Sequence, residues 1–257
     1  MEYFVICVVA FLASGLTLFS GFGLGTILLP AFALFFPIDV AIALTAVVHF
    51  LNNLFKLFLV GKFANKAVVL AFGLSAIFAA FWGAQTLLWL GNIKPIMKYA
   101  LSDHEFFIAP VKLIIAVLMI AFAFFEILPQ FSKINFDKKY LPAGGLLSGF
   151  FGGLSGNQGA FRSAFLVKCG LPKESFIATG VVIACMVDVS RISVYGTHIF
   201  SGVLNEQKTL LLATVLSAFL GAFISNRFVK KITLRIVQNI VTAMLVLIAL
   251  LLGVGII

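Results

Sequence analysis

Long apolar runs separated by short polar gaps dominate the sequence. A helix rises about 1.5 Å per residue, so roughly 20 apolar residues cross the ~30 Å hydrocarbon core of a bilayer. Six runs reach that length: residues 40–60, 67–90, 106–128, 175–196, 209–228 and 236–256. The pattern therefore predicts a polytopic helical membrane protein.

Two further apolar stretches are interrupted by glycine. One covers residues 3–36 and is broken at 20–25, and the other covers 141–170 and is broken at 152–159. Because glycine costs about 1 kcal/mol in a helix interior, such clusters should interrupt a helix. The fragments 26–36 and 141–151 rise only about 16 Å, half a bilayer. The half-helices after Gly25 and Gly159 would present free N–H groups inside the membrane, which suits an anion.

The basic residues discriminate between two topologies. Fourteen of the 18 Lys and Arg residues lie outside the apolar runs. If each broken stretch crosses the membrane once, these residues divide six against eight between the two sides. If each stretch doubles back, they divide eleven against three, which is the bias expected of cytoplasmic loops. We therefore expect re-entrant stretches, with both termini outside and the central linker inside.

The two halves of the chain match at an offset of 135 residues. Residues with a structural or polar role coincide at this offset: Ser20-Gly21 with Ser155-Gly156, Pro37 with Pro172, Asn53 with Asp188, and Lys56 with Arg191. Under the re-entrant topology the second half begins on the opposite side of the membrane, so the repeats are inverted. We predict an all-α fold with a membrane repeat at 1–128, a cytoplasmic linker at 129–140 and a second repeat at 141–257. Each repeat has one Gly-broken segment and three full transmembrane helices.

Composition agrees with this architecture and excludes other classes. Of the residues, 62% are hydrophobic and 11% charged, against roughly 45–50% and about 25% in soluble domains. A net charge of +9 would suggest nucleic acid in a soluble protein. Here the basic residues fill the gaps between apolar runs, so no nucleic-acid partner is expected. The sequence has no Walker A lysine motif, and no ATP hydrolysis, cofactor or metal site is predicted.

A polar stripe marks the second apolar helix of the first half. His49, Asn52, Asn53 and Lys56 stand at i, i+3, i+4 and i+7, which places them on one face that should turn to the bundle interior. The functional interpretation makes His49 a proton-linked residue and Lys56 a gating residue. Lys56 lies near the inner end of the run, so it could equally extend to the headgroups.

Charged residues also fall inside the apolar segments of the second half. Arg162 stands three residues after Gly159, where a buried cation needs an anion or an acid as partner. It is either a ligand for a substrate anion or the structural partner of an acid such as Asp188. Asp188 and Arg191 share one helix face. They either neutralise each other, or Asp188 takes a proton while Arg191 binds or gates the anion.

The segment from Gly21 to Pro30 (GFGLGTILLP) resembles the first-repeat signature of the sulfite exporter TauE/SafE family. The second Gly-rich break and Pro172 sit where the family has its second copy. Two departures stand out: Leu24 replaces a glycine in the first copy, and Asn157 and Gln158 replace glycines in the second. The resemblance implies a membrane permease for sulfite, sulfoacetate or another sulfonate.

Inverted repeats with interrupted helices place a transporter's site near the membrane midplane. We therefore predict a secondary transporter of the bacterial inner membrane that carries a small sulfur-containing anion by alternating access, with proton coupling. His49, Lys56 and Asp188 are the predicted coupling and gating residues. The predicted substrate-binding residues are Gly21, Gly23, Gly25, Asn52, Asn53, Ser155, Gly156, Asn157, Gln158, Gly159, Arg162 and Arg191.

Other interpretations stay open at this point. The substrate could be a carboxylate or a metal cation, although a cation carrier would need more carboxylates than Asp188 alone. Outside transport, the chain could be a membrane subunit of a complex, or an intramembrane hydrolase that uses Ser155 with His49. The expected partners are the small anion and the lipid bilayer, and the pattern leaves a homo-oligomer open.

Overall fold

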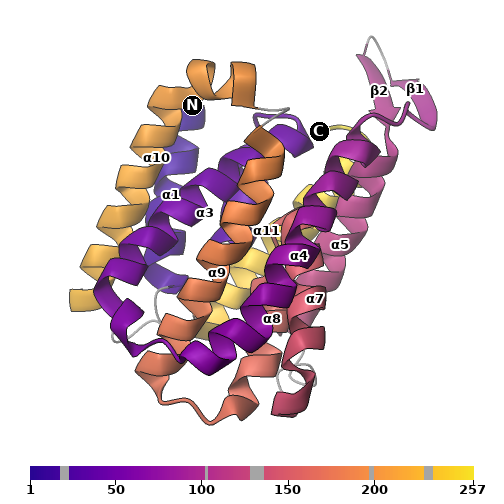
Figure 1. Cartoon of the computed structure of the whole chain (residues 1–257). Coiled ribbons are helices and arrows are strands. Elements are labelled where there is room, and N and C mark those ends of the chain that lie inside the picture. Colours follow the sequence, from indigo (N-terminus) through magenta and orange to yellow (C-terminus); the bar gives the residue numbers. More distant parts are fainter. Residues whose placement is uncertain (18–22, 102–103, 128–135, 197–199, 229–233) are drawn as a thin grey trace.

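A computed structural model describes the chain except residues 18–22, 102–103, 128–135, 197–199 and 229–233. Helices make up nearly all of it (Figure 1). The α-helices are α1 (Glu2–Thr17), α2 (Leu24–Ala33), α3 (Ile38–Val60), α4 (Lys66–Gly91), α5 (Pro110–Ile127), α7 (Leu141–Ser155), α8 (Gly159–Leu166), α9 (Lys173–Gly196), α10 (Phe200–Phe228) and α11 (Leu234–Gly253). Three short 3-10 turns, η1 (Gly61–Phe63), η2 (Lys138–Tyr140) and η3 (Val167–Cys169), follow α3, precede α7 and follow α8.

The helices have the length and surface of a membrane bundle. Within the described residues, four segments are long and apolar enough to cross a bilayer: Ile38–Phe63, Lys66–Gly91, Lys173–Gly196 and Glu206–Ile224. Large apolar side chains such as Phe58, Leu74 and Phe78 lie exposed on the outside. Exposed apolar surface on this scale is costly in water and favourable in lipid. The prediction of an all-α membrane protein is confirmed at this level.

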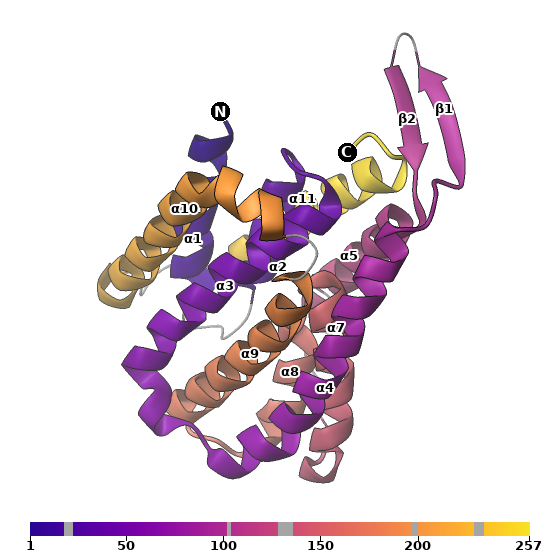
Figure 2. The same cartoon turned by 45° about the horizontal axis from the view of Figure 1, so that its top comes forward.

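One predicted helix begins later than the apolar run suggests. Residues 106–108 of the run 106–128 belong to strand β2 (His104–Ile108), which pairs antiparallel with β1 (Met97–Leu101). Helix α5 begins at Pro110, whose ring suits a first helical turn and disfavours helix in the residue before it. This small hairpin lies at the same end of the bundle as both termini (Figures 1 and 2).

Each half begins with two short helices packed on each other, α1 on α2 and α7 on α8. The first helix of each pair makes its most extensive contacts with the other half of the chain: α1 packs along α10, and α7 packs along α4. Between these pairs α3 packs on α9, and α5 packs on α11. Corresponding helices of the two halves thus make corresponding contacts, as Figure 2 lets the reader follow.

Glycine makes the close helix pairs fit. A Cβ added to Gly149 of α7 would lie 2.2 Å from the carbonyl oxygen of Ala76 in α4, and one added to Gly153 would lie 2.1 Å from that of Ala80. In the second pair, a Cβ on Gly221 of α10 would lie 2.0 Å from the carbonyl oxygen of Phe11. Small residues are the usual means of bringing helix backbones together in lipid, where apolar attraction between helices is absent.

Candidate functional site

The glycine breaks of the two halves meet inside the bundle. A Cβ added to Gly25, at the start of α2, would lie 3.4 Å from the carbonyl oxygen of Gly156 and 3.7 Å from Cδ2 of His49. Gly156 has φ 80° at the end of α7, and Gly23 has φ 109° just before α2. Only glycine adopts such angles without strain, so both breaks depend on it. The two interruptions predicted from the sequence therefore adjoin one another in space.

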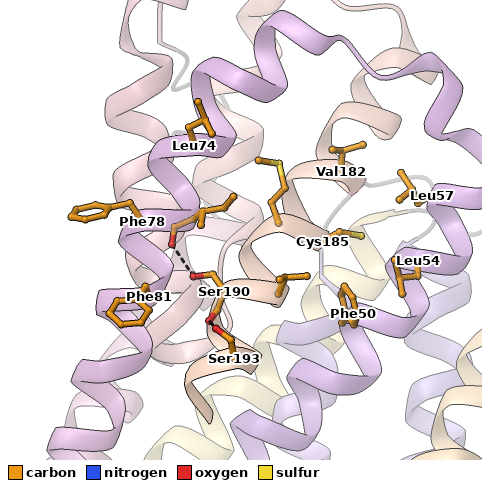
Figure 3. Close-up of a pocket in the computed structure, with 13 residues that line it drawn as sticks. Phe50, Leu54, Leu57, Leu74, Phe78, Phe81, Val182, Cys185, Ser190 and Ser193 are labelled. Carbon is orange, nitrogen blue, oxygen red and sulfur yellow. Dashed lines mark hydrogen bonds between the residues drawn. The ribbon is translucent and has the colours of Figure 1, made fainter. Parts of the chain in front are cut away.

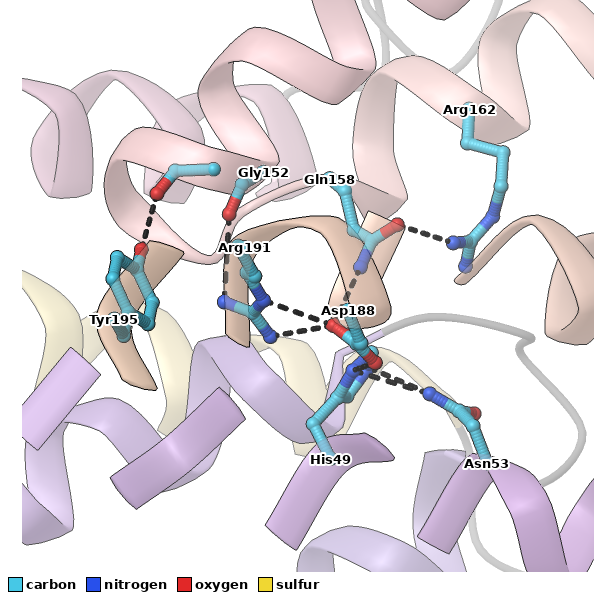
Figure 4. A network of polar contacts seen from close by, with 9 residues as sticks. His49, Asn53, Gly152, Gln158, Arg162, Asp188, Arg191 and Tyr195 are labelled. Atoms are coloured by element: carbon cyan, nitrogen blue, oxygen red, sulfur yellow. Dashed lines mark hydrogen bonds and ion pairs between the residues drawn. The ribbon is translucent and has the colours of Figure 1, made fainter. Parts of the chain in front are cut away.

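Beside these breaks lies a buried ionic cluster (Figure 4). Oδ1 of Asp188 lies 2.9 Å from Nε and 2.7 Å from Nη2 of Arg191, and its Oδ2 lies 2.6 Å from Nδ1 of His49. Asp188 and Arg191 are fully buried, and His49 nearly so. Of the two sequence interpretations of Asp188 and Arg191, the structure supports the ion pair. It adds His49 from α3, so the cluster joins the two halves of the chain.

The cluster continues through an amide to Arg162. Nε2 of Gln158 donates to Oδ1 of Asp188 at 3.3 Å, and Nη1 of Arg162 donates to Oε1 of Gln158 at 3.1 Å. Figure 4 shows Gln158 between the two charged groups. Gln158 is the residue before α8, and Arg162 lies in that helix's first turns. Arg162 and Asp188, which the sequence offered as a direct pair, are thus linked by Gln158.

The polar stripe of α3 is buried, as its spacing predicts, but it divides between two neighbours. Nδ2 of Asn53 lies 3.1 Å from Nδ1 of His49 and belongs to the ionic cluster. Oδ1 of Asn52 instead accepts a hydrogen bond from Ser14 of α1 at 2.8 Å. Lys56 is only 5% exposed. The stripe therefore serves both helix packing and the cluster.

The remaining predicted residues of the second half lie around the second break. Oγ of Ser155 donates to the carbonyl oxygen of Phe151 at 3.0 Å, and Asn157 contacts Ser155 at 3.4 Å. The hydrogen bonds of Ser155 thus stay within the second break, to Phe151 and Asn157. Gly159 is the first residue of α8. Gly21 lies outside the described residues.

Unpartnered polar atoms also lie in this region. Within the described part of the chain, Oδ1 of Asn157, Nδ2 of Asn52 and Oγ1 of Thr45 are buried without a hydrogen-bond partner. A Cβ on Gly25 would lie 4.0 Å from the methyl group of Thr45, which places this threonine beside the two breaks. Buried polar groups without partners are rare, so they point to a water or a ligand.

Comparison with known proteins places the chain in a family. The family model described as Sulfite exporter TauE/SafE matches residues 6–252, nearly the whole chain. The protein belongs to the TauE/SafE sulfite exporter family. It is thus a multi-pass membrane protein of a transporter family, as the first-repeat signature implied. No curated protein and no solved structure gives a significant match.

Two residues of this TauE/SafE protein escaped the sequence analysis. The hydroxyl of Tyr195 donates to the carbonyl oxygen of Gly153, and Oγ of Ser148 donates to that of Gln158 at 2.8 Å. Both bonds hold the second break in place. Tyr195 stands four residues after Arg191 and so shares its helix face. This spacing in the sequence could have identified it. Ser148 lies in a Gly-rich run that offers no such signal.

A separate groove of about 830 Å³ lies between α3 and α4, with α9 as its floor. Figure 3 shows its aliphatic and aromatic lining, including Phe50 and Phe78. Its two hydroxyls bond to backbone oxygens: Ser190 to Ile77 at 2.8 Å and Ser193 to Ser190 at 2.7 Å. This groove offers an anion no charged group. The ionic cluster of Asp188 and Arg191 is separate from this groove, whose lining includes neither residue.

Proposed function

We propose that the protein is a secondary transporter that carries sulfite, sulfoacetate or another small sulfur-containing anion across the bacterial inner membrane. One observation carries the proposal: in a chain of the sulfite exporter family, a buried and mostly cationic cluster adjoins the two glycine breaks. The buried ionic side chains described are Lys56, Arg162, Asp188 and Arg191, three cations and one carboxylate. Burying an excess of positive charge is unfavourable unless an anion answers it.

The substrate site comprises the two breaks and the groups that surround them. On the first half these are Gly21, Gly23, Gly25, Asn52 and Asn53. The second half contributes Ser155, Gly156, Asn157, Gln158, Gly159, Arg162 and Arg191. Guanidinium and amide groups form the strong, directional hydrogen bonds that an oxyanion needs. The start of α2 adds free backbone N–H groups beside the second break.

We propose alternating access between two inverted repeats. The first helix of each half packs against a helix of the other half, so the two halves can move relative to each other around a site between them. The contacts that support this are the matching pairs α1–α10 and α4–α7, together with the α3–α9 contact between them. His49 and Asp188 meet across that last contact at 2.6 Å. We assign proton coupling to this pair, because protonation changes the charge balance of the cluster. The eleven-to-three division of the basic residues supports a topology with both termini outside and each broken stretch re-entrant.

Flux in proteoliposomes tests the proposal. The wild-type protein should exchange radiolabelled sulfite across the membrane, and an imposed pH gradient should drive its accumulation. Arg162→Gln should abolish flux, and Lys168→Gln should leave it unchanged, because Lys168 is half exposed and pairs with Asp137 at the surface. His49→Gln should retain exchange and lose the response to the pH gradient. Wild-type vesicles that exchange no sulfur-containing anion would rule out the transport function.

A further inference from the structure

The hydroxyl of Thr45 differs from three other helical hydroxyls of the chain. In a helix, a threonine or serine hydroxyl can donate to the carbonyl oxygen four residues earlier. Thr86, Thr214 and Ser155 do so, at 2.8, 2.7 and 3.0 Å. Thr45 of α3 is only 2% exposed, yet among the described residues its Oγ1 has no hydrogen-bond partner. The local bond that would satisfy this buried hydroxyl is therefore left unmade.

Thr45 lies where the two glycine breaks meet. A Cβ added to Gly25 would lie 4.0 Å from Cγ2 of Thr45 and 3.7 Å from Cδ2 of His49. The same Cβ would lie 3.4 Å from the carbonyl oxygen of Gly156, at the second break. Thr45 also stands four residues before His49, so it adds one helical turn to the polar stripe of α3. A further polar side chain is thus placed at the proposed substrate site.

The start of α2 brings backbone donors to the same point. The first N–H groups of a helix have no carbonyl partner within that helix. Residues 24–26 form the first turn of α2 and are buried, and the residue before them, Gly23, has no side chain that could accept from these groups. Helix starts of this kind favour an anion. Thr45 therefore stands next to a set of neutral donors that suits the same ligand.

The second break contributes an unpartnered polar atom as well. Asn157 directly follows Gly156 and is 4% exposed, and its Oδ1 has no hydrogen-bond partner in the described part of the chain. Its amide carries both an acceptor and donors, so it can bond to many polar ligands. Buried polar atoms without partners are rare in folded proteins. Here one stands on each side of the junction, which indicates that a bound molecule completes it.

We propose that the hydroxyl of Thr45 is a direct ligand of the transported anion and donates a hydrogen bond to one of its oxygens, beside the start of α2. This inference rests on the proposed transport function and deepens it by adding a neutral donor from the first half of the chain. Because the hydroxyl has no bond within the protein to give up, the full value of its hydrogen bond goes to the substrate.

Thermal stabilisation by sulfite and by sulfoacetate, measured on the purified full chain, tests the inference. Thr45→Val replaces the hydroxyl by a methyl group and should lower the affinity for the stabilising anion at least about tenfold, the loss expected for one hydrogen bond to a charged group. Thr45→Ala should show the same loss, and Thr45→Ser, which keeps the hydroxyl, should stay within about threefold of the wild type. Without ligand, Thr45→Val should unfold at or above the wild-type midpoint, because no bond within the protein is lost.

The matched control is Thr214→Val. It makes the same substitution at a fully buried threonine of α10, whose hydroxyl already bonds to the carbonyl oxygen of Leu210 at 2.7 Å. Because that hydroxyl has its partner within the helix, the variant should bind the anion as tightly as the wild type. Exchange in proteoliposomes gives a second measurement: Thr45→Val should raise the sulfite concentration for half-maximal exchange, and Thr214→Val should not.

Three outcomes would overturn the inference. If Thr45→Val binds the anion as tightly as the wild type, the hydroxyl bonds only to water. An equal loss of affinity in Thr45→Ser would assign the effect to the shape of the side chain. A lower unfolding midpoint of Thr45→Val without ligand would mean that the hydroxyl has a partner within the protein. In each case anion exchange by the wild type persists and the transport function stands, whereas wild-type protein that neither anion stabilises and that exchanges neither would refute the transport function itself.

Discussion

Replacing Asp188 by asparagine tests whether the buried carboxylate holds the two halves of the chain together. The substitution keeps the side chain's volume and removes one charge from the interior. Arg191 then loses its ionic partner, and the short contact to His49 becomes one between neutral groups. The amide can still accept one hydrogen bond, but its NH2 group faces donors where the second carboxylate oxygen stood.

The magnitude follows from the burial of both partners. Asp188 and Arg191 are each 0% exposed, and removing one member of a buried ion pair typically costs about 3–5 kcal/mol, because the remaining charge is left uncompensated. For a chain of this size, each kcal/mol lowers the midpoint of unfolding by roughly 2–4 °C. We expect Asp188→Asn to unfold roughly 6–20 °C below the wild type in the same detergent.

The chain offers a matched control for this substitution. Asp137 pairs with Lys168 at 3.2 Å, but their side chains are 62% and 46% exposed. Exposed pairs of this kind contribute about 0–1 kcal/mol, so Asp137→Asn should leave the midpoint almost unchanged. The double variant Asp188→Asn/Arg191→Gln should recover part of the loss, since it no longer buries an unpaired cation.

Differential scanning fluorimetry measures the unfolding midpoint of the four purified proteins: the wild type, the two single variants and the double variant. If Asp188→Asn melts as close to wild type as Asp137→Asn does, Asp188 carries no charge that Arg191 depends on, and the ion-pair argument is refuted. A double variant less stable than Asp188→Asn would show that the unpaired guanidinium of Arg191 is not what destabilises the single variant. Flux by the stable double variant then tests whether Asp188 is needed for transport beyond its role in folding.

Three further substitutions probe the glycine contacts and the second break. Gly149→Ala should destabilise the protein by about 1–3 kcal/mol, because its methyl group would meet the backbone of Ala76. The control is Gly91→Ala, where an added methyl group meets nothing within 4 Å. Equal melting points of the two variants would contradict the close packing of α4 on α7. Gly25→Val should abolish sulfite flux. Gly25→Ala should preserve it, since a single methyl group makes only ordinary contacts there. Sulfite flux by the valine variant would place the substrate elsewhere. Tyr195→Phe should cost about 0.5–1.5 kcal/mol in thermal unfolding through loss of one buried hydrogen bond, and no change would mean that bond is not formed.

The local features that the sequence singled out depend on local chemistry, and the structure shows them. Glycine clusters interrupt helices wherever they stand, and the structure has a break with positive φ at both Gly23 and Gly156. The stripe that contains His49 follows from helical spacing and is buried as expected. Asp188 and Arg191 lie three residues apart on one helix and do form an ion pair. Each inference needed only a few neighbouring residues.

What the sequence could not supply was the pairing between distant segments. Nothing in the stripe indicates that His49 reaches Asp188, 139 positions later, or that Asn52 turns to Ser14 instead. The hairpin around residue 104 was also missed, because an apolar run of aromatic residues suits a strand as well as a helix. In each case the deciding contact is tertiary, and local pattern carries no information about it.

The packing of the helices gives these long-range contacts a common cause. The first helix of each half is held by the fourth helix of the other half, through contacts so close that only glycine fits at Gly149 and Gly221. Between these pairs α3 packs on α9, and Gly25 at the start of α2 adjoins Gly156 at the end of α7. The ionic cluster therefore forms where both halves contribute a helix and a break. A chain cut between its halves would lose the close helix pairs and the cluster together, so the candidate site depends on both halves of the chain.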